Sequence, residues 1–227
     1  MAKKIYLSPS SQESNAYATG NTTEMIECRE ISDACAVFLR KAGFDVKNGD
    51  YGTMYTRVAE SNSWGADLHV AIHTNATKDH KTTGGTQIYL IKLTDEHKKV
   101  GQAVLDRLAP LTPGKSAEGL KKNTEFYEIN EVDAITVYVE AEFHDTKTGS
   151  DYIRNNTTEI GEAIAKGICD YYGVKLVAET PKKENNAPSE DGTLYVVRAG
   201  AFKDKANADN RVKALKKAGF EAYVKKE

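Results

Sequence analysis

The chain has 227 residues, of which 40% are apolar, and its 31 basic and 33 acidic residues leave a net charge of −2. A chain of this length forms one or two domains and buries roughly 70% of its unfolded surface, enough for a hydrophobic core. The charge excludes a generally basic nucleic-acid binder, and no apolar run reaches the ~18 residues that span a membrane.

Strands and helices are predicted to alternate along residues 4–172. Short apolar or alternating runs predict strands at 4–8, 44–47, 68–72, 86–91 and 134–143. Helical spacing of apolar residues predicts helices at 24–42, 55–64, 95–108 and 150–172, the first with Thr23 as its N-cap and Gly43 as its stop. This order is typical of an α/β fold with a mostly parallel twisted sheet flanked by helices.

Composition divides the chain into unequal parts. Residues 178–192 hold two of the five prolines and almost no apolar side chain, which predicts a linker. Residues 193–227 carry nine basic and four acidic residues, a net charge of +5, whereas the rest of the chain carries −7. We therefore predict a domain over 1–177, a linker over 178–192 and a small βαβ module over 193–227.

The N-terminus and the cysteines both indicate where the chain is made. The start, MAKKIYLSPS, has too short an apolar stretch for a secretory signal. Cys28 and Cys35 lie on one predicted helix, about 10 Å apart, too far for a disulfide. With Cys169 they are expected to be free and buried. We expect cytoplasmic synthesis without a signal peptide, so any action outside the cell requires release by another route.

The predicted strand 68–72 ends at His73, where a polar loop begins. His69 and His73 share one face of the strand, and His69, the deeper of the two, is interpreted as a packed histidine. On its own, His73 is better explained as a histidine that caps a strand edge. Its position at a carboxyl end, where α/β folds bind ligands, favours a functional role.

The predicted strand 134–143 brings a second set of ionisable side chains to the same edge. Glu140, Glu142 and His144 alternate with apolar residues and are expected on one face. A solvated face at a sheet edge would explain them, but the preceding TVYV run is apolar on both faces and favours a central strand. Buried carboxylates there need a cation or another partner.

Glu24 opens the first long helix, where an acidic residue also complements the helix dipole. Together with His73 and Glu140, however, Glu24 indicates a metal site. Imidazole and carboxylate ligands around one divalent ion, with a spare carboxylate for a water molecule, are typical of hydrolytic zinc sites.

In the order of its motifs, the chain resembles the zinc-dependent N-acetylmuramoyl-L-alanine amidases of bacterial cell walls. The similarity covers residues 3–176 and is most specific at ADLHVAIHTNA and VYVEAEF. It implies Glu24 and His73 as zinc ligands and Glu140 as the catalytic carboxylate that takes a proton from water and returns it to the leaving amine. It implies Asn75 as a loop-ordering residue, and Arg57 matches the arginine that precedes ADL in the family.

Two positions depart from the usual family pattern. The histidine ligand that normally follows the first strand is missing from the segment SPSSQ, and Gln12 lies nearest to its place. The SPS-x-Q start resembles clostridial and phage members, which favours Gln12 as the third ligand, with Glu13 and His144 as other candidates. Glu142 replaces a glycine and adds a carboxylate that is expected to raise the pKa of Glu140.

Four side chains are candidate substrate contacts: Asn15, Arg57, Asn75 and Lys121. The resemblance implies bacterial peptidoglycan as the substrate, with no nucleic-acid or membrane partner. Synthesis without a signal peptide fits a phage endolysin, and it also fits a sporulation autolysin that digests the wall of its own mother cell. A non-catalytic wall-binding protein and a zinc carboxypeptidase acting on the stem peptide are the alternatives.

The basic tail resembles the first half of a SPOR domain, a module that binds peptidoglycan. The similar segments are YVVRAGAF and LKKAGFEAYV, with a predicted helix between them. So short a unit rarely stabilises itself. We expect two chains to pair their halves into a homodimer; a truncated module, a loosely ordered tail or a merely solvated basic helix are the alternatives.

If the tails pair, sedimentation velocity will show a monomer–dimer equilibrium that shifts to the dimer as the protein concentration rises. A strict monomer whose tail is folded would reject the pairing.

Overall fold

The computed structural model describes residues 2–49, 52–77 and 84–175, together with Lys205, Val212, Tyr223 and Val224. The chain divides into two units, Met1–Ala178 and Glu179–Glu227. The predicted linker lies outside the described residues, and so does the predicted βαβ module apart from these four residues.

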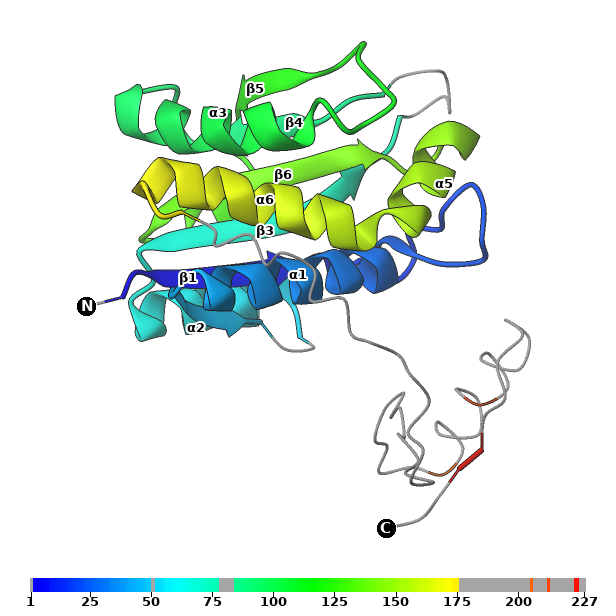
Figure 1. Ribbon diagram of the computed structural model, residues 1–227, viewed down its shortest axis with the longest axis horizontal. Helices are drawn as coiled ribbons and strands as arrows, with labels where there is room; N and C mark the ends of the chain where they lie inside the picture. Colours follow the sequence, from blue (N-terminus) through cyan, green and yellow to red (C-terminus); the bar gives the residue numbers. More distant parts are fainter. Residues whose placement is uncertain are drawn as a thin grey trace, which may run out of the picture. The chain divides into compact units, whose positions relative to one another are not determined.

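The first unit is built on one six-stranded sheet with the strand order β2-β1-β3-β6-β4-β5 (Figure 1). The strands are β1 (Lys4–Pro9), β2 (Asp45–Asn48), β3 (Leu68–Asn75), β4 (Gln87–Leu90), β5 (Gly119–Lys122) and β6 (Ile135–Phe143). Neighbouring strands are parallel except β4 and β6, which are antiparallel. The predicted mostly parallel α/β fold is thereby confirmed, with β6 inside the sheet as its apolar TVYV run indicates.

Helices cover both faces of the sheet. The helices are α1 (Glu24–Lys41), α2 (Met54–Trp64), α3 (Asp95–Leu108), α4 (Tyr127–Asn130), α5 (Lys147–Asn155) and α6 (Thr157–Tyr172). Helices α1, α6 and α3 lie side by side in front of the sheet in Figure 1, with α6 between the other two. Helices α2 and α4 contact each other, and α4 contributes to a smaller apolar cluster with Ala71 and Tyr138. The sheet is thus buried on both sides, as parallel sheets require.

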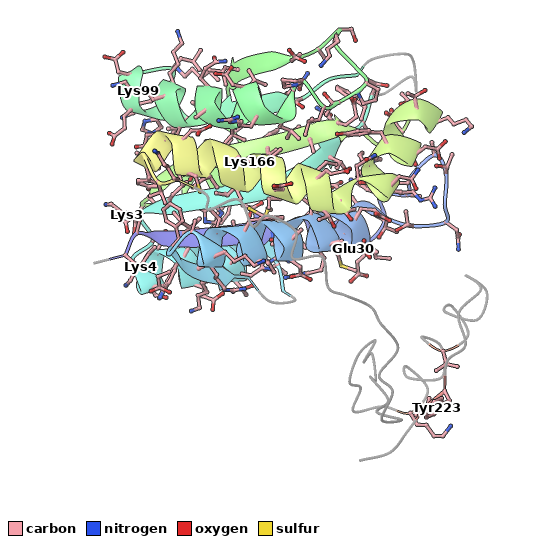
Figure 2. All side chains as sticks on the ribbon, viewed as in Figure 1. Lys3, Lys4, Glu30, Lys99, Lys166 and Tyr223 are labelled. Carbon is pink, nitrogen blue, oxygen red and sulfur yellow. The ribbon has the colours of Figure 1, made fainter. Side chains whose placement is uncertain are left out.

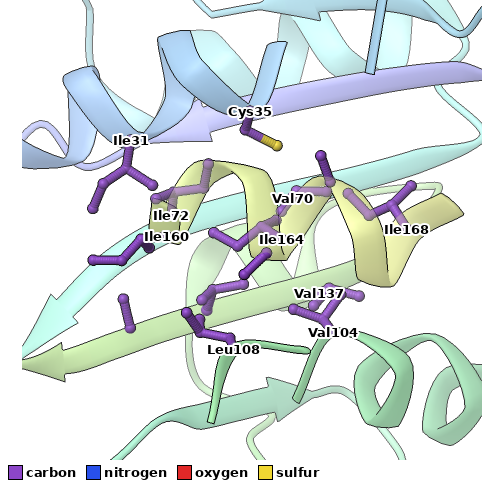
Figure 3. Packing of buried hydrophobic residues seen from close by; sticks show 14 of the residues in the cluster. Ile31, Cys35, Val70, Ile72, Val104, Leu108, Val137, Ile160, Ile164 and Ile168 are labelled. Carbon is purple, nitrogen blue, oxygen red and sulfur yellow. The ribbon is translucent and has the colours of Figure 1, made fainter. Parts of the chain in front are cut away.

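The main core lies between the sheet and the layer of α1, α6 and α3 (Figure 3). Ile164 and Ile168 of α6 point toward Val70 and Val137 of the central strands, and all four side chains are fully buried. Gly161 lets α6 approach α1 closely: a Cβ at this position would lie 2.5 Å from the carbonyl oxygen of Ile31. This contact fixes the position of α1, and hence of Glu24 at its first residue.

Charged side chains cover the outside of these layers, as Figure 2 shows for Lys3, Lys99 and Lys166. Lys3 pairs with Asp67 at 2.7 Å, and Lys166 pairs with Glu162 one helical turn away at 2.9 Å. Exposed pairs of this kind contribute about 0–1 kcal/mol each. Stability therefore rests mainly on the buried layers. No helix within the described residues is long and apolar enough to cross a membrane.

The helices and strands of the structure agree with the predicted ones, with two differences. The predicted helix 150–172 is two helices, because Asn156 leaves the helical conformation with φ −133° and ψ 25°. The strand β5 and the one-turn helix α4 were not predicted; each has only four residues, too few for an apolar period. Cys28, Cys35 and Cys169 are free and buried, as predicted. Thr23 occupies the N-cap of α1, without a hydrogen bond from its side chain.

We predict that Gly161→Ala destabilises the protein by about 1–3 kcal/mol, because the added methyl group forces α6 away from the backbone of α1. Urea unfolding followed by circular dichroism measures the change. Gly101→Ala in α3 is the matched control: its methyl group meets only the side-chain ends of Leu90 and Leu120, so it is expected to be nearly neutral. Equal effects of the two substitutions would contradict the close packing of α1 and α6.

Candidate active site

The register of the central strands assembles the site. In the parallel pair of β3 and β6, His73 lies opposite Glu140, near the carboxyl end of both strands. Glu24, the first residue of α1, reaches the same point after the polar loop that follows β1. Residues from three separate parts of the chain therefore meet where the sequence predicted a site.

His73 is buried between two carboxylates. Its Nδ1 lies 2.8 Å from Oε1 of Glu24, and its Nε2 lies 3.3 Å from Oε2 of Glu128. The ring also stacks on Tyr138, with ring centres 4.4 Å apart. Burial alone lowers the pKa of His73, but the hydrogen bonds with Glu128 and Glu24 raise it to about 10. Without a metal, the imidazole is therefore held as a cation between two anions.

Asn15 joins Gln12 to Glu24. Its amide nitrogen donates to Oε1 of Gln12 at 2.8 Å and to Oε2 of Glu24 at 2.7 Å. Burial tends to raise the pKa of Glu24, but the hydrogen bonds with His73 and Asn15 lower it below its ordinary value. The structure thus connects His73, Glu24 and Gln12 through one chain of hydrogen bonds, and it places Asn15 within that chain.

Glu140 differs from the other carboxylates of the site. It is 8% exposed, and its Oε2 is a buried oxygen without a hydrogen-bond partner. Burial raises its pKa to about 8; the positive charge of His73 opposes this rise, and the charge of Glu24 adds to it. A buried carboxylate with an unused oxygen and a raised pKa has the properties of a general acid–base group.

The donor atoms of the site suit zinc. They are one imidazole nitrogen from His73, one carboxylate from Glu24 and one neutral amide oxygen from Gln12, the last a weaker ligand than imidazole. Among the described residues, no group of three His, Cys, Asp or Glu side chains is placed to hold a metal ion, and this donor set has only two residues of those types. The chemistry of the donor atoms fits the metal, with an amide in the place of one imidazole.

Glu142 and His144 were expected beside Glu140, and in the structure their side chains have other hydrogen-bond partners. The carboxylate of Glu142 accepts hydrogen bonds from the backbone N–H groups of Gly85 at 2.8 Å and Gly114 at 3.0 Å. It holds two loops together and is not among the groups that shift the pKa of Glu140. The Nδ1 atom of His144 lies 2.9 Å from the Thr74 hydroxyl, and its ring stacks on Tyr17. These contacts turn His144 toward Thr74, the neighbour of His73.

The remaining candidates have varied surroundings. The Asn75 amide donates to Gln87 at 3.0 Å, across the end of β6, in keeping with a loop-ordering role. Arg57 is only 4% exposed, and its guanidinium donates to the carbonyl groups of Pro9 and Gly52, so it braces the end of β1; its contact with substrate stays a prediction. Glu13 and Lys121 are exposed.

Glu128 also belongs to the site, although it was not predicted from the sequence. It lies on α4, is 3% exposed, and its carboxylate contacts His73 and the hydroxyl of Ser8. The pKa of Glu128 lies well below its ordinary value, because the neighbouring imidazoles of His69 and His73 outweigh the effect of burial. The surrounding letters YEIN carry no apolar period, and only tertiary structure brings this residue to the site.

The family model described as N-acetylmuramoyl-L-alanine amidase matches residues 7–170, and the chain belongs to this family. The function that follows is that of a peptidoglycan amidase. A second model, the SPOR domain, matches residues 175–226. The sporulation-specific N-acetylmuramoyl-L-alanine amidase of Bacillus subtilis (strain 168) is 26% identical over 239 aligned positions, which cover 97% of this chain and 84% of the relative.

Solved structures share the fold. The catalytic domain of CwlV, an N-acetylmuramoyl-L-alanine amidase from Bacillus (Paenibacillus) polymyxa var. colistinus, superposes with a TM-score of 0.68 at 16% identity, covering 76% of this chain and 99% of that one. The amidase AmiC2 of Nostoc punctiforme gives 0.67 at 19% identity, over 75% of this chain and 97% of that one. An amidase from Clostridium difficile 630 gives 0.66 at 22% identity, over 77% and 98%.

We predict that Glu142→Ala lowers the free energy of unfolding by about 2–4 kcal/mol, because the backbone N–H groups of Gly85 and Gly114 lose a charged acceptor. Thermal unfolding followed by circular dichroism measures the loss. Glu131→Ala, at an exposed glutamate just before β6, serves as the control and is expected to change stability by less than about 0.5 kcal/mol. A Glu142→Ala protein as stable as the control would contradict the loop-holding role.

Proposed function

We propose that the chain is a zinc-dependent hydrolase of the amide bond between the N-acetylmuramoyl group and L-alanine. Glu24, His73 and Gln12 would hold the metal, since one chain of hydrogen bonds through Asn15 joins them. The observation that carries the proposal is the unpartnered Glu140 carboxylate, buried opposite His73. When bound, zinc supplies Lewis-acid polarisation of a water molecule and of the scissile carbonyl group.

Glu140 would move the proton in this reaction. As a carboxylate it takes a proton from the water whose oxygen bonds to the carbonyl carbon. It then gives that proton to the nitrogen of L-alanine as the carbon–nitrogen bond breaks, leaving a carboxylate on the lactyl group and a free amine on the peptide. A pKa raised by burial suits a group that must first accept and then donate.

The role of Asn15 follows from its two hydrogen bonds. By donating to both Gln12 and Glu24, its amide keeps their oxygens close together. A neutral amide oxygen is a weak zinc ligand, so its contribution depends on being held in place. Asn15 is therefore proposed as a residue that orders the ligands, in addition to its expected contact with substrate.

The biological setting is proposed from the curated relative. Its name is that of a sporulation-specific amidase, and the similarity extends over nearly the whole chain. This favours a sporulation autolysin, released to the wall of its own mother cell, over a phage endolysin. The SPOR match supports a tail that binds peptidoglycan, and the pairing of two tails into a homodimer stays a prediction.

Replacement of the expected histidine ligand by Gln12 favours one alternative, a wall-binding protein without catalysis. The buried, unpartnered Glu140 argues against it. Such a carboxylate destabilises the fold, and a protein that only binds the wall has no need of one. The two functions differ in whether zinc is bound and whether amide bonds are cut.

We predict that Glu140→Gln keeps zinc but lowers the rate of wall digestion by about 10²–10⁴-fold, because the amide cannot take the proton from water. Metal analysis gives the zinc content, and analysis of digested cell walls gives the products. Freed amino groups of L-alanine are expected, in the absence of new reducing ends or freed D-alanine.

Two controls complete this test. Removing zinc with a chelator is expected to abolish digestion, and restoring zinc to recover it. A fully active Glu140→Gln protein would contradict the assignment of Glu140, and a zinc-free, inactive wild-type protein would support the wall-binding alternative.

A further inference from the structure

We infer that Glu128 is a positioning residue, which fixes the ring of His73 so that Nδ1 is presented to the metal; this inference rests on the proposed zinc-dependent function. Neither the sequence motifs nor the family resemblance points to Glu128. The structure points to it because four elements, β1, β3, α2 and α4, converge on its carboxylate or on the groups that fix it.

The two ring nitrogens of His73 have different partners. Nδ1 lies 2.8 Å from Glu24, on the side where Gln12 and Asn15 gather, and Nε2 lies 3.3 Å from Glu128, on the opposite side of the ring. A ring nitrogen that binds a metal must offer its lone pair, so the ring proton must sit on the other nitrogen. Glu128 accepts a hydrogen bond from the Nε2–H group, which keeps the ring proton on Nε2 and leaves the lone pair of Nδ1 available to the metal.

The carboxylate of Glu128 is itself held in place. The Ser8 hydroxyl of β1 donates to its Oε1, and Nε2 of His69 lies 3.7 Å from the same oxygen. His69 is in turn fixed by the Ser61 hydroxyl of α2, 3.0 Å from its Nδ1, and by stacking on Tyr6. A buried carboxylate with these neighbours has little freedom to rotate.

The backbone that carries Glu128 is fixed as well. Phe126, just before α4, packs at a tilt against Tyr138, and Tyr138 stacks on the ring of His73 itself. The side chain of Asn123 accepts from the backbone N–H groups of residues 125 and 126 and shapes the turn into α4. The same aromatic stack that orients the plane of His73 therefore also sets the position of Glu128.

A carboxylate behind a metal-binding imidazole is a known way to fix the tautomer of the ring and to increase its basicity, and its loss typically costs about 10–100-fold in metal affinity or activity. In this chain the loss of the carboxylate is expected to weaken zinc binding strongly. Because Gln12 is a neutral ligand, His73 and Glu24 supply most of the affinity for zinc.

The test compares Glu128→Gln with the wild-type protein in two measurements that do not depend on activity. The first is zinc affinity, by competition with a coloured chelator; the variant is expected to bind zinc about 10–100-fold more weakly. The second is NMR of the histidine side chains labelled with ¹⁵N. In the zinc-loaded wild type, His73 is expected to carry its proton at Nε2, with a downfield signal that moves upfield in the variant.

Glu27→Gln is the matched control. Glu27 is also a buried carboxylate, on the same helix as Glu24, but its charged neighbours are Glu30 and Arg154. It is expected to keep both the zinc affinity and the Nε2 proton signal of the wild type. Circular dichroism of both variants establishes that each is folded, and if Glu128→Gln fails to fold, Ser8→Ala tests the same carboxylate through its Oε1 partner.

The outcomes separate this inference from the proposed function. A folded Glu128→Gln protein with wild-type zinc affinity, or a zinc-loaded wild type with the His73 proton at Nδ1, would overturn the inference. A wild-type protein that takes up no zinc would overturn the proposed function instead. The Nε2 proton signal of the metal-free wild type and variant then decides by itself whether Glu128 fixes His73.

Discussion

Burial of negative charge governs the carboxyl edge of this sheet. Glu24, Glu128 and Glu140 are each less than a tenth exposed, and carboxylates in such surroundings cost several kcal/mol unless they are compensated. His73 compensates two of them by lying between Glu24 and Glu128. Glu140 keeps an oxygen without a partner. The balance of charge is thus incomplete in the protein alone, and a divalent cation would complete it.

The positions of these charged groups depend on packing far from the site. Glu24 reaches His73 because α1 begins at this residue and because close contact with α6 at Gly161 fixes the position of the helix. The opposition of His73 and Glu140 depends on the parallel register of β3 and β6, whose Val70 and Val137 lie under α6. A shift of one residue in either strand would turn one of the two groups to the other face of the sheet.

Much of this arrangement was predictable, because it follows from local patterns. Strand runs that end in polar residues located His73 and Glu140, and the start of an amphipathic helix located Glu24. Glu128 was not predictable in this way: it lies 55 residues from His73, on a single helical turn without an apolar period. The expected row of Glu140, Glu142 and His144 failed for a physical reason as well, since the pairing of β3 and β6 shifts between His73 and Asn75.

Two strands of the sheet, β4 and β5, run against the other four, and this changes which part of the chain surrounds the site. Because β4 is antiparallel to β6, its first residue, Gln87, lies opposite Glu140, at the edge where β3 and β6 end. The connection from β3 to β4 therefore leaves and re-enters the sheet at the same edge and does not need to cross it. Its length is free of the geometric requirement that constrains every crossover in a parallel sheet. The length of this connection can therefore change while the register of β3 and β6, which places His73 opposite Glu140, stays intact.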